Sequence, residues 1–392
     1  MTIGQVEALP QLERRVVMRD AERKQVRWWT CAHSHAMLPT VPPPILGVAT
    51  NRAGFLGVAA QGPIEQPVLV TSFAEYQRVF GTPPPGRELF FGVHQFFENG
   101  GVRAWIVRLR ASSTAAIGRG LSSLDAVDHL GLLCLPGISG GSALAAAAAY
   151  ARSRRAFFVA EPSATRPATV AALRAIRRAD RGHVATHFPR LKIRDPLNPA
   201  TTILIGPSAA VAGMLSRFDI YWGVQTVPAG TTAHLLGAVG VASAIDEQGA
   251  ASLRREGINA IRQVPGHGIV AWGARTLGAG SESGEDWQYI PVRRTALYLE
   301  ESLYDGIGWA VFEPNDEPTW RRLREAIEAF LEHTRLQNGF AGATPAESYF
   351  VRCGSNTTTQ NDIDNGVVVI EIGFAPFRPA EFVQFRIRHR RH

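Results

Sequence analysis

The chain has 392 residues, of which 45% are hydrophobic, and a net charge of +7. This length exceeds one ordinary hydrophobic core and predicts two or three domains. Only Lys24 and Lys192 of its 41 basic residues are lysines. The arginine excess favours a negatively charged binding partner, and composition alone does not distinguish an acidic protein, nucleic acid and an anionic membrane. Three widely spaced cysteines exclude a disulfide framework and a Cys-x-x-Cys metal site.

Neither a membrane span nor a secretory signal is expected. No stretch approaches the ~18 apolar residues of a spanning helix, and the first residues lack a continuous apolar run behind their charges. We therefore expect synthesis in the cytoplasm without a signal peptide.

The predicted elements alternate between strand and helix along most of the chain. Residues 1–45 are Arg-rich and end in a proline cluster, which predicts an arm or linker. Apolar runs predict strands, and periodic patterns stopped by glycine predict helices. The expected strands are 45–50 continuing to 54–60, 68–72, 104–109, 131–137, 156–162, 268–274, 287–291, 308–315, 348–353 and 366–376. The expected helices are 73–80, 88–99, 142–155, 168–179, 293–306 and 317–338.

The last of these helices has the clearest signals. Asn315 or Asp316 can cap it, Pro318 lies in its first turn and Gly339 follows its end. Its expected buried face consists of Trp320, Leu323, Ile327, Phe330, Leu331 and Thr334. Residues 190–232 carry several prolines and are expected to be loop-rich, with a domain boundary nearby.

The alternation predicts an α/β fold with helix-flanked mixed sheets in two domains and extended terminal arms. We expect an N-terminal arm at 1–45, an outer α/β region at 46–235, a C-terminal domain at 236–378 and a C-terminal arm strand at 379–392. The segment from Phe382 to Arg388 alternates between two faces beyond a proline break, so it needs a sheet edge. That edge belongs either to its own sheet or to another chain.

One segment resembles a catalytic motif. Gly137 to Gly141 fits G-x-S-x-G between a strand and a helix, the context of a nucleophile elbow with Ser139. Pro136 and Gly137 separate the serine from the strand end, and no downstream histidine has a recognisable context. A strand-to-helix loop is the better interpretation, and we expect no catalytic residues.

Other candidate sites are also weak. Cys31, His33 and His35 alternate but lack a fourth metal ligand. Asp362, Asp364 and Gly366 suggest a calcium loop, but Gly373 stands where the closing glutamate belongs, so a capped turn is expected. The basic tail has no aromatic platforms for nucleic acid. We expect no cofactor and no metal.

Several long motifs of the final third occur in order: INAIRQVPGHGIVAWGARTL, YIPVRRTALYLEESLYDGIGWAVFEPNDEPTWRRLREAIEAFL, TTTQNDIDNG and GFAPFRPAEFVQFRI. Together they resemble the C-terminal domain of contractile tail sheath proteins of phages, R-type tailocins and extracellular contractile injection systems. VATNRAGFLGVAAQGP and FFENGGVRAWIVRL resemble earlier segments of that family. The resemblance implies a subtilisin-like middle portion without protease activity.

The resemblance also implies a structural function. The subunit would polymerise as stacked hexameric rings around an inner tube, and contraction would drive the tube through a target envelope. Its partners would be further copies of itself, the inner tube protein, and baseplate and cap proteins, without nucleic acid or membrane insertion. Alternatives are a sheath-derived baseplate or cap component, or a serine hydrolase that uses Ser139.

In that family, terminal arms add strands to a neighbour's C-terminal domain. The corresponding C-terminal strand here would be Phe382, Val383, Gln384, Phe385, Arg386, Ile387 and Arg388. For the N-terminal arm, the candidate strand is Val26, Arg27, Trp28 and Trp29, in QVRWWT, with VVMRD at 16–20 as the alternative. Charges expected to face the tube or a neighbour are Arg321, Arg322 and Arg324.

Overall fold

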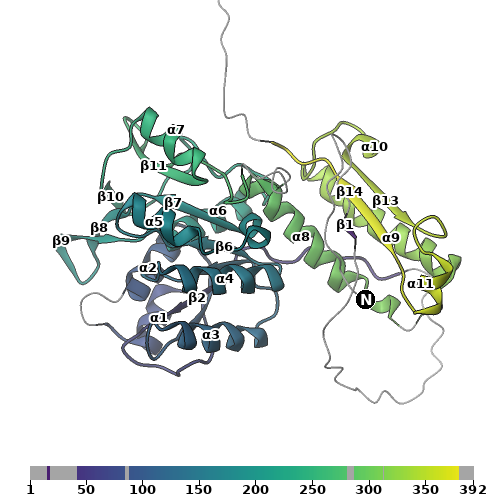
Figure 1. Cartoon of the computed structure of the whole chain (residues 1–392), viewed down its shortest axis with the longest axis horizontal. Helices are drawn as coiled ribbons and strands as arrows, with labels where there is room; N and C mark the ends of the chain where they lie inside the picture. Colours follow the sequence, from purple (N-terminus) through teal and green to yellow (C-terminus); the bar gives the residue numbers. More distant parts are fainter. Residues whose placement is uncertain (1–15, 18–41, 84–87, 280–286, 312, 379–392) are drawn as a thin grey trace, which may run out of the picture.

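The computed structural model describes residues 16–17, 42–83, 88–279, 287–311 and 313–378. Figure 1 shows two lobes on either side of helix α8 (Ile290–Gly306). We call residues 42–279 the large lobe, and residues 287–378 with strand β1 (Val16–Val17) the small lobe. Within these ranges, none of the helices combines the length and the apolarity that a membrane crossing requires.

The large lobe is built on an eight-stranded sheet in the order β12-β11-β7-β6-β5-β2-β4-β3. The six central strands are parallel to their neighbours, and antiparallel β3 and β12 close the two edges. The strands are β2 (Arg52–Gly57), β3 (Val68–Val70), β4 (Arg103–Arg108), β5 (Leu132–Cys134), β6 (Phe157–Ala160), β7 (Val184–Phe188), β11 (Ile258–Val264) and β12 (Gly268–Ala271).

Helices cover both faces of this sheet, which explains the continuous apolar strands. On one face, α1, α2 and α6 enclose a core with Phe55 and Phe96; on the other, α3, α4, α5 and α7 enclose Leu56 and Phe158. The mixed α/β fold class is therefore confirmed. The helices are α1 (Phe73–Phe80), α2 (Glu88–Glu98), α3 (Thr114–Ser123), α4 (Gly141–Ser153), α5 (Arg166–Leu173), α6 (Ser208–Tyr221) and α7 (Glu247–Arg255).

Residues 190–232 are more regular than expected. They contain helix α6 and the hairpin of β8 (Leu191–Asp195) and β9 (Asn198–Ile205), which β10 (Ala238–Val241) extends to a three-stranded antiparallel sheet. Pro199 lies in β9, an edge strand, and Pro207 directly precedes α6. Prolines are tolerated at both kinds of position, so here they mark element boundaries instead of loops.

The expected domain boundary between residues 235 and 236 also differs from the boundary in the structure. β11 pairs in parallel with β7, and β12 pairs with β11, so residues expected in the C-terminal domain complete the large sheet. Ile258 packs into the core on one face of the sheet and Ile261 into the core on the other. The small lobe therefore begins after residue 279.

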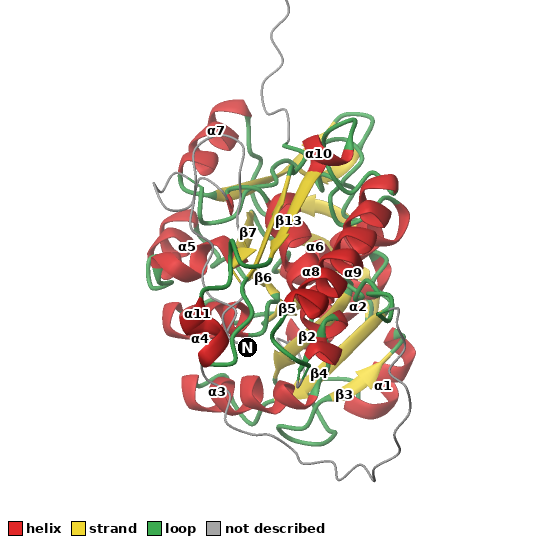
Figure 2. Cartoon of the chain, turned by 90° about the vertical axis from the view of Figure 1, so that its right-hand side faces the viewer, coloured by secondary structure: helices red, strands yellow, loops and turns green. Residues whose placement is uncertain are grey.

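The small lobe packs α8 and α9 (Glu317–Leu336) on a three-stranded sheet in the order β1-β14-β13. Figure 2 looks onto this lobe and shows α8 and α9 next to each other. Its other strands are β13 (Tyr349–Cys353) and β14 (Ile370–Phe374), and its short helices are α10 (Pro345–Ser348) and α11 (Gln360–Asp364).

Helix α9 follows its prediction closely. Asp316 caps it by accepting a hydrogen bond from the Thr319 backbone nitrogen at 3.1 Å, and Pro318 lies in its first turn. Asn315 instead accepts from the Trp320 indole at 2.8 Å. All six residues of the expected apolar face are buried, so the helical periodicity is confirmed.

Three expected strands are absent from the described ranges. Residues 45–50 are extended but carry no strand pairing, and 308–315 contain only the short 3₁₀ helix at Gly308–Ala310. In 287–291, Tyr289 forms a single bridge with Arg275 before α8 begins at Ile290. Ile290 and Pro291 are buried as the first residues of α8, whereas among the described residues of the other two segments only Ile45 and Ala310 are buried.

Candidate functional site

The sheet of the small lobe is the first candidate site, because a sheet edge can accept a strand from another chain. Its central strand β14 pairs with β13 along its whole length. On the other side it pairs with β1 through only two residues, Val16 opposite Ile372 and Val17 opposite Glu371. β1 lies within the VVMRD segment, the alternative N-terminal arm strand.

The other predicted arm and metal residues lie outside the described ranges. This applies to Phe382–Arg388, to Val26–Trp29, and to the Cys31, His33 and His35 trio. Their roles stay predictions.

The three predicted surface arginines of α9 differ in their surroundings. Arg321 is 65% exposed and only loosely paired with Glu325 at 4.0 Å. Arg322 pairs with Glu313 at 3.0 Å and stacks on the Trp309 ring. Arg324 pairs with Glu317 at 2.7 Å and donates to the Cys353 carbonyl. Only Arg321 is thus largely available to another molecule.

The second candidate site is the joint between the lobes, centred on α8. Ile290 and Leu297 pack into the large-lobe core, whereas Ala296, Leu299 and Leu303 pack into the small-lobe core. A helix that is apolar on several sides must be buried between layers. α8 therefore belongs to both cores.

The extended segment 45–51 crosses α8 and continues into β2. The Val48 backbone nitrogen donates to Ser302 Oγ at 3.0 Å. A Cβ on Gly306 would lie 2.5 Å from Ile45, so glycine is needed for this close approach. The segment thus links the small-lobe end of α8 to the large sheet.

A buried ion pair joins α8 to α6. Arg294 donates to both carboxylate oxygens of Asp219, at 2.7 and 2.6 Å, and the two side chains are 4% and 5% exposed. Thr50 completes the site: its hydroxyl donates to Asp219 at 2.6 Å and its carbonyl accepts from Arg294 at 3.2 Å. Every charge in this bidentate pair is compensated, as burial requires.

The preceding residue, Arg293, makes a second buried contact. Its guanidinium donates to Glu300 at 3.2 Å and to His183 Nε2 at 2.8 Å, and lies 4.5 Å from the Trp287 ring centre. Because arginine only donates, His183 Nε2 must accept and Nδ1 must carry the proton toward the Ala156 carbonyl. Burial, with the charge of Arg293, holds the pKa of His183 well below its usual value.

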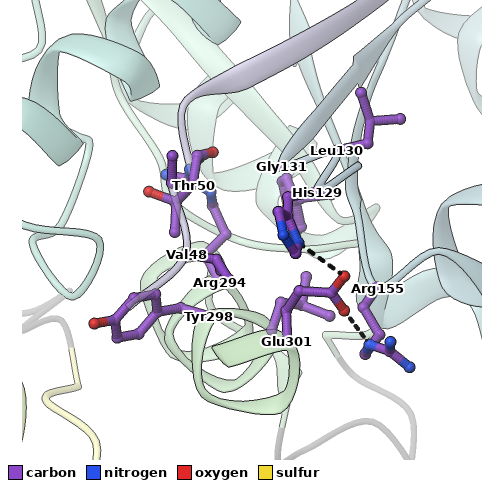
Figure 3. A pocket seen from close by; sticks show the side chains of 12 residues that line it. Val48, Thr50, His129, Leu130, Gly131, Arg155, Arg294, Tyr298 and Glu301 are labelled. Atoms are coloured by element: carbon purple, nitrogen blue, oxygen red, sulfur yellow. Dashed lines mark hydrogen bonds and ion pairs between the residues drawn. The ribbon is translucent and has the colours of Figure 1, made fainter. Parts of the chain in front are cut away.

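Farther along α8, charged side chains surround a small pocket of about 20 Å³ (Figure 3). Arg155 donates to Glu301, and His129 faces the same carboxylate. His129, Glu301 and Asp305 have potential ligand atoms within 4.8 Å of one another. These residues come from the large lobe and from α8, so the pocket lies within the joint.

Ser139 lies in the loop between β5 and α4, after Gly137 in the left-handed region at φ +76°. Among the described residues, no hydrogen bond connects it to a histidine or carboxylate. His183 is bound to Arg293, and His234 faces the His267 carbonyl at 2.9 Å. No catalytic dyad is assembled around Ser139 in this part of the chain.

A buried serine and carboxylate do meet at the carboxyl ends of β5 and β6. Ser208 donates to Glu161, and both are 1% exposed. Burial, with the nearby charge of Glu88, raises the pKa of Glu161 to about 8. Glu88 pairs with Arg190 and accepts from the Gly206 nitrogen at 3.2 Å. A substrate cannot reach Ser208 and Glu161, so this pair fixes α6 to the end of β6, and the contacts of Glu88 fix α2 to the β8–β9 hairpin.

The suggested calcium loop is a helix cap. Asp362 accepts from the Thr359 backbone nitrogen at 2.9 Å, and Thr359 accepts from the Asp362 nitrogen at 3.2 Å. This reciprocal capping box begins α11, and Gly366 follows with φ +69°. The expectation of a capped turn is confirmed.

The buried ion pair between Arg294 and Asp219 predicts a large effect on stability. Arg294→Ala should lower the free energy of unfolding by about 3–5 kcal/mol, because Asp219 is left charged and unpaired in the interior. Arg321→Ala is the control, and its exposed position predicts a change within about 0.5 kcal/mol. Denaturant unfolding of both variants measures the difference. Equal effects would contradict the structural role of the pair.

His183 predicts a pH dependence with a definite sign. Because its pKa is lowered in the fold, the unfolded chain binds more protons as the pH drops below about 6.5. Wild type should lose up to about 1.4 kcal/mol per pH unit there, relative to His183→Gln, whose amide can also accept from Arg293. The free energy of unfolding of both proteins, measured across this pH range, checks the prediction. Parallel pH curves for wild type and His183→Gln would refute it.

Comparisons with known proteins agree with the architecture. A family model for the phage tail sheath C-terminal domain matches residues 282–390. No curated protein sequence matches the chain.

Solved sheath structures match over nearly the whole length. The helical sheath of the anti-feeding prophage (AFP) in its contracted state is 25% identical, with a TM-score of 0.76, over 93% of this chain and 100% of that chain. The sheath complex of PVC, an extracellular contractile injection system, in the contracted state is 26% identical, with a TM-score of 0.74, over 94% and 99%.

A chain of the AFP baseplate, with 24% identity and a TM-score of 0.74 over 93% of this chain and 100% of that chain, shares the same fold. The C-terminal family match lies over the small lobe, and the sheath structures align with both lobes. Residues 282–390 therefore match the phage tail sheath C-terminal domain family, and the chain resembles contractile sheath proteins along nearly its whole length.

Proposed function

We propose that this chain is the main sheath subunit of a contractile particle. Copies polymerise as stacked hexameric rings around an inner tube, and contraction drives the tube through a target envelope. The observation that carries the proposal is the alignment of 93–94% of this chain with 99–100% of sheath chains. Both lobes and their joint thus have counterparts in proteins described as contracted sheaths.

The small-lobe sheet supports a strand-exchange mechanism. β1 occupies only two positions of β14, and residues 18–41 connect it to the large lobe. At about 3.3 Å per residue, such a connection extends to roughly 80 Å. The β1 strand can therefore pair with its own β14 or with β14 of a neighbour, and we propose the latter in the sheath.

The C-terminal arm is the second connector. The last 14 residues of the sequence, 379–392, can extend roughly 45 Å at about 3.3 Å per residue. In our proposal, Phe382–Arg388 adds a strand to the small-lobe sheet of an adjacent copy. Such head-to-tail contacts repeat without closing on themselves and build a helical lattice.

The proposed partners are an inner tube protein, a baseplate and a terminal cap. Arg321 is the best-placed of the predicted arginines to meet an acidic surface of the tube or of a neighbour, because Arg322 and Arg324 are held by contacts within the chain. We also propose synthesis in the bacterial cytoplasm and a non-enzymatic function. Energy is then stored in the lattice, and contraction proceeds by burying more surface between subunits.

A baseplate or cap component is the alternative, favoured by the shared fold with the AFP baseplate chain. Electron microscopy of purified particles distinguishes the two. The main subunit gives striated tubes in long and short forms, with the chain present along their length. Labelling confined to one end of the particle would favour the alternative.

The C-terminal arm predicts an assembly defect with a matched control. Val383→Ser, Phe385→Ser and Ile387→Ser together should abolish tubes while the subunit stays folded, because one face of the arm strand loses its apolar contacts. Gln384→Ser, Arg386→Ser and Arg388→Ser together should leave assembly largely intact. Sedimentation and microscopy compare the two triple variants. Tube formation by the first triple variant would contradict the proposed role of the C-terminal arm.

Arg321 predicts a charge-dependent defect. Arg321→Glu should weaken assembly on the tube at low salt, since an attractive contact becomes repulsive, and its unfolding transition should stay close to that of wild type. Arg174→Glu, an exposed charge reversal after α5 in the large lobe, is the control. Co-sedimentation with tube protein measures both, and equal binding by wild type and Arg321→Glu would remove Arg321 from the tube contact.

A further inference from the structure

A cleft of about 480 Å³ lies between the two lobes, beside the end of α6. The large lobe lines it with the extended segment 48–51 and the turn at 221–225. Tyr298 of α8 and Gln337 at the end of α9 line its other side. The volume is within the range of protein binding pockets, about 300–1,000 Å³, so we call this feature the joint cleft.

The rim of the joint cleft exposes aromatic side chains. Tyr221 is 71% exposed and Trp222 is 52% exposed, and their ring centres lie 5.7 Å apart. Tyrosine and tryptophan carry much of the binding energy at protein interfaces. Among the described residues that line the cleft, Asp219 alone carries a charge, and that charge is bound to Arg294. These walls favour an uncharged and partly apolar occupant.

The hairpin of β8 and β9 presents a segment of this kind. We call residues 196–201 the hairpin tip; none of them is charged, and Leu197 is 43% exposed. Asn198 and Thr202 pair with adjacent residues of β8, so the three residues between them bulge out of the ladder. The tip therefore protrudes and belongs to none of the described hydrophobic cores.

The base of the hairpin is fixed to the large lobe. Leu191, Ile193 and Ile205 are buried in its core, and Arg190 pairs with Glu88 of α2. Figure 1 shows the hairpin at the edge of the large lobe that lies farthest from the small lobe. The tip is therefore too far from the joint cleft of its own chain to enter it, and it is free to enter the cleft of another copy.

We propose that the hairpin tip of one copy inserts into the joint cleft of a second copy, against Tyr221 and Trp222. This inference rests on the proposed function, because it concerns copies within the polymer. Proline-containing segments dock in aromatic-lined grooves, and Pro196 and Pro199 lie on either side of Leu197 in the tip. Because the tip and the cleft are different surfaces of one chain, the contact is head-to-tail and repeats from copy to copy.

Cross-linking between full-length copies tests the contact. Leu197→Cys and Gln337→Cys are made in separate copies, each also carrying Cys31→Ser, and the two are mixed before assembly. A short bis-maleimide linker added to the assembled tubes should join position 197 of one copy to position 337 of another, which mass spectrometry of the linked peptides detects. The matched control replaces Gln337→Cys with Val311→Cys, exposed on the small lobe outside the cleft, and should give no link.

A charge placed in the tip gives a second readout. Leu197→Asp should raise the protein concentration required for tube assembly about tenfold or more, because the carboxylate must be desolvated in an uncharged cleft. Leu204→Asp is the control, since Leu204 is similarly exposed near the base of the same hairpin, and it should assemble as wild type. Both variants should unfold like wild type, because both side chains lie on the surface.

Each result decides the proposal. A link between positions 197 and 337 that is absent from the Val311→Cys control, with an assembly defect confined to Leu197→Asp, supports it. The absence of that link from normally formed tubes overturns the insertion and leaves the proposed sheath function intact, and so does normal or equally reduced assembly of the two aspartate variants. Failure of wild type to form tubes contradicts the proposed function and the insertion together.

Discussion

The buried ion pair between Arg294 and Asp219 is the contact on which the relation of the two lobes depends. Both charges lie in the interior, so neither can be exposed or lost without a large cost in stability. Its geometry fixes α8 against α6, and the same helix supplies apolar side chains to both cores. The contacts of Arg293, Glu301 and Asp305 extend this fixed joint along α8.

A fixed joint has a consequence for the proposed sheath. If the lobes stay together, the changes in contraction fall on the connections between subunits, the terminal arms that leave the small-lobe sheet. Such connections can rotate while strand pairing is kept, because backbone hydrogen bonds do not depend on the orientation of the rest of the chain.

Local sequence patterns were sufficient to predict α9, because its cap at Asp316 and its apolar face are both encoded within about twenty residues. They were not sufficient where the partner is distant. Parallel pairing of β11 with β7 spans some seventy residues of sequence, so the large sheet gains a strand that the local pattern assigned elsewhere. Arg293 and Arg294 follow the same rule. Two adjacent arginines at the start of a predicted helix carry no local sign of burial, and only His183 and Asp219, brought in by folding, make their burial favourable.

The Arg294–Asp219 pair couples the lobes, and a double-mutant cycle tests this coupling most directly. Asp219→Ala, Arg294→Ala and the double variant are compared with wild type in their free energies of unfolding. The double variant should be less destabilised than the sum of the two single variants, with a coupling energy of about 1.5 kcal/mol or more. Additive effects, with a coupling energy near zero, would contradict it.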